Sequence, residues 1–381
     1  MTVRRRVVVI GGGIAGVSAA WALAERHDVT LLEAESQLGS HATGRSAATL
    51  SETVGHRTVC ALATASRSFL ERPPIGFSEH SLTGPRGLLW IGREGDADAL
   101  DAIAAMAATG VAPTARRIDV EAATSIVPAL RPVAVAAGAV WEPDALALDV
   151  AGLLTAFAAG ARARGATLRR GVRVRACRRD GSDGSWAVEL DGDTIGADVI
   201  VDAAGAWGDE VASSAGVRPL GLAPLRRTAC LVPAPDEVAG WPLVMDAAER
   251  CYFEPEAGGL LLSPADEHAG TPMDARAETE DVAWALDMLA ETTTLAVRSV
   301  RRAWAGLRTF TPDRVPAVGW DPDVAGFCWL VGQGGAGIKT APARAAAVAS
   351  IVGERPWPDD LGAVGVSPSE LDPARFADRR A

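Results

Sequence analysis

The hydrophobic positions at the start of the chain alternate between short apolar runs and a longer helical stretch. Residues 7–10 are a β-branched run, typical of a buried parallel strand. A glycine-rich turn at 11–16 leads into an Ala-rich segment at 17–26 that predicts a helix, and 29–33 predicts a second strand. The order strand, turn, helix, strand predicts a βαβ unit with a parallel sheet.

Helices and strands continue to alternate along the chain. A helix is predicted at 149–164, capped by Asp149 and closed by Gly165. Later strands are expected at 172–177, 186–190 and 194–202, then between 216 and 310 around one helix near 281–291, and finally at 327–331. A glycine loop at 332–337 opens a last helix at 340–352, and the prolines and charges after Gly353 predict a loosely packed tail.

A length of 381 residues is too great for one ordinary core, so we expect two domains. Nucleotide-binding patterns occur at the start, middle and end, with β-rich segments between them. The fold class is therefore predicted as α/β, a discontinuous Rossmann-like nucleotide-binding domain with an inserted, largely antiparallel β substrate domain. The expected bounds are 1–50, 145–215 and 306–360 for the first, 51–144 and 216–305 for the second, and 361–381 for the tail.

Composition narrows the possible partners. The formal net charge of −11 argues against nucleic acid or an anionic membrane surface. The five cysteines are scattered without a C-x-x-C pair and the five histidines form no metal-ligand pattern, so we expect no disulfide and no metal, as in a cytoplasmic protein. Arg4, Arg5 and Arg6 precede an apolar run that imitates a signal peptide, but glycines interrupt the run, and no transmembrane segment is expected.

The turn at 11–16 carries the most specific chemistry. It satisfies G-x-G-x-x-G, and Gly11, Gly13 and Gly16 allow the backbone to approach a pyrophosphate that then lies at a helix N-terminus. Glu33 ends the next strand about twenty residues further on, where an acid accepts hydrogen bonds from a ribose hydroxyl. The alternative, a glycine-rich turn without a ligand, explains the strand, helix and acid less well.

Two other segments are weaker signals. Residues 41–48 are small and polar with one cation, Arg45, and suit the far half of a phosphate-bearing cofactor. The glycine loop at 333–340 opens a helix, so its N–H groups suit the N1–C2=O edge of a reduced flavin, which is anionic. Either segment alone is equally compatible with a tight turn.

Together with the fingerprint, these segments resemble the D-amino-acid oxidase superfamily of FAD enzymes, and within it the D-arginine dehydrogenases most. The resemblance covers almost the whole chain except the tail. It is carried by the segments at 41–48, 65–80, 125–131, 203–210, 215–227, 304–310 and 333–340. Several of these are irregular loops with no packing reason to coincide, so the likeness is specific.

The resemblance implies hydride transfer from an amino acid α-carbon to flavin N5, giving an imino acid that hydrolyses to a 2-oxo acid and ammonia. It also implies FAD bound without a covalent link, because Gly306 stands where sarcosine oxidases carry their flavin-linking cysteine. The residues that it places at the cofactor are Gly11, Gly13, Ile14, Ala15, Gly16, Glu33, Ala34, Thr43, Gly44, Arg45, Ser46, Ala47, Ala48, Val174, Ala204, Gly205, Trp207, Arg308, Gly334, Gly335, Ala336, Gly337, Ile338, Lys339 and Thr340.

The same resemblance predicts how a substrate is held. Arg308 and Tyr252 match a carboxylate-binding arginine and tyrosine, and a planar guanidinium suits a bidentate pair with a carboxylate. Arg227 matches an arginine near the substrate, and the carbonyl of Gly335 would accept from the substrate amine. Lys339, the only lysine of the chain, matches a carboxylate-binding lysine of monomeric sarcosine oxidase and is predicted to bind the carboxylate or the flavin C2=O edge.

Departures from the family pattern concern the substrate side chain. Leu88 stands where D-arginine dehydrogenase has a glutamate, and Thr49 and Val54 replace its histidine and tyrosine. A neutral or apolar D-amino acid is therefore expected. A secondary-amine or cyclic imino acid oxidase of the sarcosine or glycine oxidase type, or a non-catalytic flavin-binding protein, remains an alternative. The electron acceptor stays open between a quinone, an electron carrier and O2, although Leu261, in place of an oxygen-activating lysine, predicts slow reaction with O2.

Overall fold

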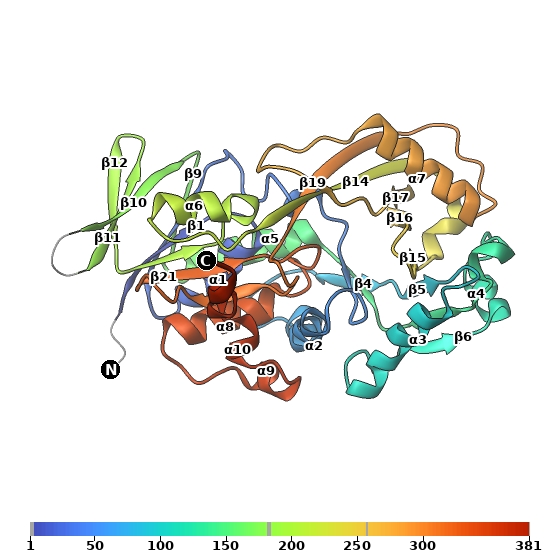
Figure 1. Cartoon of the computed structure of the whole chain (residues 1–381), viewed down its shortest axis with the longest axis horizontal. Helices are drawn as coiled ribbons and strands as arrows, with labels where there is room; N and C mark the ends of the chain where they lie inside the picture. Colours follow the sequence, from blue (N-terminus) through green and yellow to red (C-terminus); the bar gives the residue numbers. More distant parts are fainter. Residues whose placement is uncertain (1–3, 181–183, 257, 381) are drawn as a thin grey trace.

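The structure, a computed structural model, describes residues 4–180, 184–256 and 258–380. Two large sheets lie side by side, one mostly parallel and one mostly antiparallel (Figure 1). The predicted α/β class, with a Rossmann-like unit and an antiparallel β unit, is confirmed. The outermost predicted bounds, 1 and 381, lie outside the described residues.

The parallel sheet has six strands in the order β20-β21-β13-β1-β2-β9. Only β20 runs antiparallel to its neighbour. Its strands are β1 (Arg6–Ile10), β2 (Asp28–Glu33), β9 (Thr167–Arg170), β13 (Val199–Asp202), β20 (Ala317–Trp320) and β21 (Phe327–Val331). Val7, Val8 and Val9 are all buried, because helices or a small sheet cover both faces of β1.

One face of the parallel sheet packs against α1 (Ile14–Leu23), α5 (Val150–Ala163) and α8 (Ala341–Val352). The other face carries α6 (Gly208–Ser214) and a three-stranded sheet. That small sheet consists of β10 (Val174–Asp180), β11 (Ser185–Leu190) and β12 (Asp193–Ala197). Most strands and helices expected here from the sequence are present, with ends that differ by a few residues. The single strand expected at 194–202 is wrong, because this segment forms two strands, β12 in the small sheet and β13 in the parallel sheet.

The antiparallel sheet has nine strands, and β14 and β19 form its longest pair. Its strands are β5 (Leu88–Ile91), β6 (Arg116–Ile118), β7 (Ala139–Glu142), β14 (Ala223–Pro233), β15 (Leu243–Asp246), β16 (Tyr252–Glu256), β17 (Gly259–Ser263), β18 (His268–Ala269) and β19 (Arg302–Phe310). One face packs under α4 (Val120–Ile126) and α7 (Thr279–Thr292), with Phe253 at its centre. The opposite face carries Tyr252 and Leu88.

The remaining elements connect the two sheets or follow them. They are η1 (Thr43–Arg45), β3 (Thr49–Leu50), α2 (Arg57–Glu71), β4 (Thr83–Pro85), α3 (Ala97–Ala105), η2 (Met106–Thr109), η3 (Pro132–Val135), β8 (Leu146–Leu148), η4 (Gly205–Trp207), η5 (Asp236–Gly240), α9 (Asp359–Ala363), α10 (Pro368–Leu371) and η6 (Pro373–Arg380). Within the described residues, no helix is long and apolar enough to cross a bilayer.

Two segments pack differently from the sequence-based expectation. The tail is not loosely packed, because Leu361, Leu371 and Phe376 are buried and Arg375 forms an ion pair with Asp313. Helix α2, placed with the substrate domain by its position in the chain, packs instead beside α8 in the core of the parallel-sheet part. Burial of apolar side chains stabilises both arrangements.

Candidate active site

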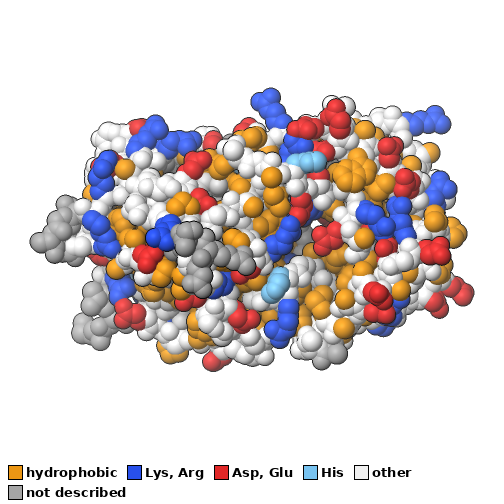
Figure 2. Space-filling view, in the orientation of Figure 1, with side chains coloured by type: hydrophobic (Ala, Val, Ile, Leu, Met, Phe, Trp, Pro, Cys, Tyr) orange, Lys and Arg blue, Asp and Glu red, His pale blue; other side chains and the backbone are white. Residues whose placement is uncertain are grey.

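A cavity of about 460 Å³ lies where the two sheets meet. It is lined by the turn after β1, the end of β2, residues 39–43 and 45–47, the segment after β13, strands β14, β16 and β19, and the glycine loop before α8. Figure 2 shows the surface hollowed near its middle, with basic and acidic side chains interspersed over this face. One end of the cavity is formed mainly by backbone and the other by charged side chains.

The backbone-lined end suits a pyrophosphate. Gly11 has φ +111°, and a Cβ there would lie 2.4 Å from the Ala203 carbonyl oxygen. A Cβ on Gly16 would lie 1.8 Å from the Gly11 oxygen, so both positions require glycine. Gly13 is the N-cap of α1 and lines the cavity, which places the positive end of a ten-residue helix at this point.

Glu33 lines the same end but already has partners. Its two carboxylate oxygens accept from the Gly12 N–H at 2.6 Å and the Glu35 N–H at 2.7 Å. In this arrangement the carboxylate fastens the glycine turn to the end of β2. A hydrogen bond from Glu33 to a ribose remains a prediction.

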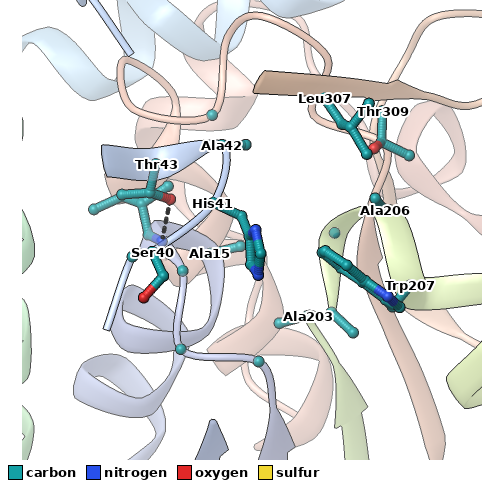
Figure 3. A pocket seen from close by; sticks show the side chains of 18 of the residues that line it. Ala15, Ser40, His41, Ala42, Thr43, Ala203, Ala206, Trp207, Leu307 and Thr309 are labelled. Carbon is teal, nitrogen blue, oxygen red and sulfur yellow. Dashed lines mark hydrogen bonds between the residues drawn. The ribbon is translucent and has the colours of Figure 1, made fainter. Parts of the chain in front are cut away.

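His41 and Trp207 lie beside one another at the wall of the cavity (Figure 3). Their ring centroids are 4.7 Å apart, and His41 Nε2 lies 3.1 Å from the Glu35 carboxylate. Nearby, the Thr43 hydroxyl accepts from the Ile14 N–H at 3.0 Å. Trp207 and Thr43 were expected at the cofactor from the sequence, whereas His41 was not, although it begins the segment at 41–48.

Most of the cofactor residues expected from the sequence line this cavity. Those that do not are Gly16, Gly44, Ala48, Ala336, Lys339 and Thr340. Gly16 and Gly44 lie behind the residues that line the cavity. Gly16 permits a close backbone approach to Gly11, and Gly44 permits one to Gly39. Sequence reasoning missed Arg173, Arg175 and Met273, which line the cavity without belonging to a motif, and Glu210, which ends the segment at 203–210.

Arg45, the cation of the 41–48 segment, lines the cavity and also ties this segment to the antiparallel part. Its Nη1 donates to the carbonyl oxygens of Ala275 at 2.7 Å and Ala305 at 2.9 Å, and its Nη2 pairs with Asp274. The guanidinium therefore holds the loop before α7 and strand β19 against the cofactor side.

The charged end is built on three strands of the antiparallel sheet, β14, β16 and β19. Arg308 on β19 and Tyr252 on β16 meet, with Arg308 Nη2 3.3 Å from the Tyr252 hydroxyl. Gly335 lies against the guanidinium, since a Cβ there would be 3.0 Å from Arg308 Cζ. A guanidinium and a hydroxyl that both face a cavity can bind a carboxylate.

Arg227 adds a second cation to this end. It is mostly buried on β14, where its Nε donates to the Asp266 carbonyl at 2.7 Å and its Nη2 lies 3.3 Å from Glu267. Burial, followed by the charge of Arg308, lowers the pKa of Arg227. Glu267 also pairs with Arg314, so one carboxylate is shared by two arginines and the cavity end keeps positive charge for an anion.

The comparisons with known proteins agree with this geometry. A family model described as FAD dependent oxidoreductase (DAO) matches residues 6–351. The chain belongs to this family. The glycine cradle, the helix N-terminus and the glycine loop fit FAD, which they would hold from both ends of the cavity.

Two sequence relatives match nearly the whole length of this FAD-dependent oxidoreductase. The chain is 28% identical over 377 residues to glycine oxidase from Geobacillus kaustophilus, covering 95% of this chain and 96% of the relative. It is 26% identical over 355 residues to glycine oxidase from Pseudomonas putida, covering 89% and 92%. The crystal structure of L-proline dehydrogenase from P. horikoshii has a TM-score of 0.83 at 23% identity, covering 100% of this chain and 99% of that chain, which shows the common fold. The expected likeness to D-arginine dehydrogenase is not supported, because these sequence relatives are glycine oxidases.

Three residues expected at the substrate lie elsewhere in this oxidoreductase. Lys339 is buried, and its Nζ donates to the carbonyl oxygens of Ser51 at 2.9 Å and Val54 at 2.8 Å, so it holds a loop and does not line the cavity. Burial lowers the pKa of this lysine. Leu88 is completely buried, and the Thr49 hydroxyl donates to Glu254 at 3.2 Å.

Glu254 is an acid that sequence reasoning missed. It follows Tyr252 by two positions on β16, so both side chains lie on the same face of the sheet. Glu254 is 3% exposed, and Arg86 Nη1 lies 3.5 Å from its carboxylate. Burial raises the pKa of Glu254. The period-two alternation of β16 is the signal that could have found it.

A group of metal-ligand side chains lies outside the cavity. Asp266, His268 and Asp281 bring their ligand atoms within 4.8 Å of one another. Arg226 already pairs with Asp281 at 2.9 Å, and the Thr228 hydroxyl donates to the same carboxylate at 3.0 Å. The guanidinium thus supplies the positive charge that these acids need.

Proposed function

We propose that this FAD-dependent oxidoreductase oxidises the Cα–N bond of a small amino or imino acid, in the manner of glycine and sarcosine oxidases, with non-covalently bound FAD. The observation that supports this most is the Arg308–Tyr252 pair in the same cavity as the nucleotide cradle. A protein that only bound a flavin would have no need of a carboxylate site beside it.

The side chains at the charged end would bind and orient the substrate. The Arg308 guanidinium and the Tyr252 hydroxyl hold its carboxylate, with Arg227 adding positive charge. The Gly335 carbonyl accepts from the substrate amine, since Gly335 lies against Arg308. FAD supplies the hydride acceptor for the α-carbon, and the protein contributes position and electrostatics.

The named relatives and the places of two expected pocket residues favour a small amino or imino acid. Leu88 and Thr49, on which the expectation of a larger apolar side chain depended, do not line the cavity. The relatives named glycine oxidases support the same conclusion.

A neutral D-amino acid is the second candidate substrate. Tyr252 belongs to an apolar cluster with Ala47 and Ala229, all three of which line the cavity, and this apolar surface favours it. Anaerobic flavin bleaching with glycine, sarcosine, L-proline, D-leucine and D-arginine separates the candidates. We expect fastest bleaching with one of the first three. Fastest bleaching with D-leucine would favour the second candidate, and no bleaching by any amine would contradict the proposed reaction.

Two further properties belong to the same proposal. None of the five cysteines lines the cavity, which supports a non-covalent flavin. After acid precipitation the yellow colour should appear in the supernatant, and colour in the pellet would contradict this.

Leu261 is buried in the same apolar cluster as Tyr252 and stands where a charged lysine would be needed to activate oxygen. We therefore expect reduction of a dye to be faster than formation of hydrogen peroxide.

A further inference from the structure

A buried arginine lies directly behind the glycine loop. Arg344, in the first turns of α8, is 1% exposed, and its Nη1 has no hydrogen-bond partner among the described residues. No ion pair joins it to a carboxylate in the part of the chain that the structure describes. Burial lowers the pKa of Arg344 to about 9, so it remains charged at neutral pH. An unpaired buried cation is costly, and near a helix N-terminus the helix dipole opposes it as well.

The other two guanidinium nitrogens act on consecutive peptide groups of the loop. Arg344 Nη2 donates to the Gly337 carbonyl at 2.6 Å. Its Nε donates to the Thr340 hydroxyl at 2.9 Å, and that hydroxyl donates to the Ala336 carbonyl at 2.8 Å. The two polarised carbonyls share their peptide groups with the N–H groups of Gly337 and Ile338.

Those two N–H groups belong to residues at the cavity. Gly337 and Ile338 both line it, and neither N–H donates to an acceptor among the described residues. A hydrogen bond to a peptide carbonyl strengthens the N–H of the same group as a donor. The loop therefore offers two strengthened donors, with a full positive charge behind them, to an anionic group in the cavity.

We infer that Arg344 is a positioning residue of the flavin site, which acts through Gly337 and Ile338 to favour the reduced, anionic cofactor. This inference rests on the proposed FAD site. It explains why the position carries a charge that stability alone disfavours, since methionine of similar length would fill the space without one.

The test uses the flavin-loaded protein without any substrate. The two readouts are the midpoint potential and the dissociation constant of sulfite, which adds to the flavin and leaves negative charge on its pyrimidine part. For Arg344→Met we expect sulfite to bind about tenfold more weakly, the effect of losing one charge-assisted hydrogen bond. The same factor in the reduction equilibrium lowers the two-electron potential by about 30 mV.

Three other variants make the test specific. Arg344→Lys keeps the charge and should recover most of both values. Thr340→Val breaks only the relay to Ala336 and should shift both in the same direction by less. Arg164→Met is the matched control, because Arg164 is an arginine that donates to the Trp21 carbonyl away from the loop, and it should change neither.

Several outcomes would contradict the inference. Flavin-loaded Arg344→Met with wild-type sulfite affinity and potential would overturn it and leave the proposed function intact. If that variant holds no FAD, Thr340→Val decides, and wild-type values there overturn it. A wild-type protein that bound no flavin would instead contradict the cofactor site itself.

Discussion

The two ends of the cavity recognise their ligands by different means. The nucleotide end is backbone, supplied by the turn after β1 and the segment after β13, where Gly11 and Ala203 touch. The substrate end consists of side chains, Arg227, Tyr252 and Arg308, on three strands. The first should therefore be damaged by adding an atom, whereas the second should be damaged by removing one.

Adding a methyl group at the nucleotide end should have the largest effect. Gly11→Ala places a Cβ 2.4 Å from the Ala203 oxygen at φ +111°, where an L side chain is strained. We expect a protein without bound FAD, measured by the ratio of flavin to protein absorbance after purification.

Gly84→Ala is the matched control for Gly11→Ala. A Cβ added to Gly84 on β4 would meet no atom within 4 Å, and the φ of this residue is not positive, so the variant should keep its flavin. Normal flavin content in Gly11→Ala would show that the turn does not form the cradle.

Removing a charge at the substrate end should have the next largest effect. Arg308→Met should keep FAD but lose about 30- to 5000-fold in kcat/KM, because losing one partner of a desolvated charge pair costs about 2–5 kcal/mol. Arg302→Met is the control, since Arg302 is exposed on the same strand. Near-normal kinetics in Arg308→Met would place the carboxylate site elsewhere.

Removing only a hydroxyl should have a smaller effect at the same end. Tyr252→Phe deletes the oxygen 3.3 Å from Arg308 Nη2 and leaves the ring in place. A hydrogen bond to a charged group contributes about 1.5–3 kcal/mol, so kcat/KM should fall about 10- to 100-fold. An unchanged kcat/KM, measured with the best substrate of the bleaching series, would mean that the hydroxyl does not touch the carboxylate.

The sequence predicted the nucleotide end well for a physical reason. Backbone recognition demands glycine at fixed spacing, and Gly11, Gly13 and Gly16 therefore appear as a motif within one βαβ unit. The first strand, the first helix and the second strand of the parallel sheet followed from the same local patterns. Burial of Leu361 and Leu371 was missed because a short run of apolar residues among prolines gives no clear period.

The substrate end could not be predicted from local patterns. Arg227 lies opposite Gly306 and Arg308 opposite Leu225, a register between β14 and β19 that no short motif encodes. The resemblance correctly placed Arg308 and Tyr252 at the cavity, but it did not show which way the side chains of Lys339, Thr49 and Leu88 point. Whether such a side chain faces the cavity depends on neighbours distant in the sequence, such as the Ser51 and Val54 carbonyls that hold Lys339.

Lys339 offers the finest test of the difference between the two ends, with the smallest expected effect on turnover. Lys339→Met removes the donor to the Ser51 and Val54 carbonyls, and an unsatisfied buried acceptor costs about 1–3 kcal/mol. We expect a lower urea midpoint of unfolding and a change of less than about threefold in KM, since well under 1 kcal/mol of carboxylate binding is then lost. Arg26→Met, which removes an exposed cation, should alter neither. If Lys339 instead bound the substrate carboxylate, KM would rise as steeply as in Arg308→Met while the urea midpoint stayed constant. That result would show that the loop at 51–54 opens to let the lysine reach the cavity.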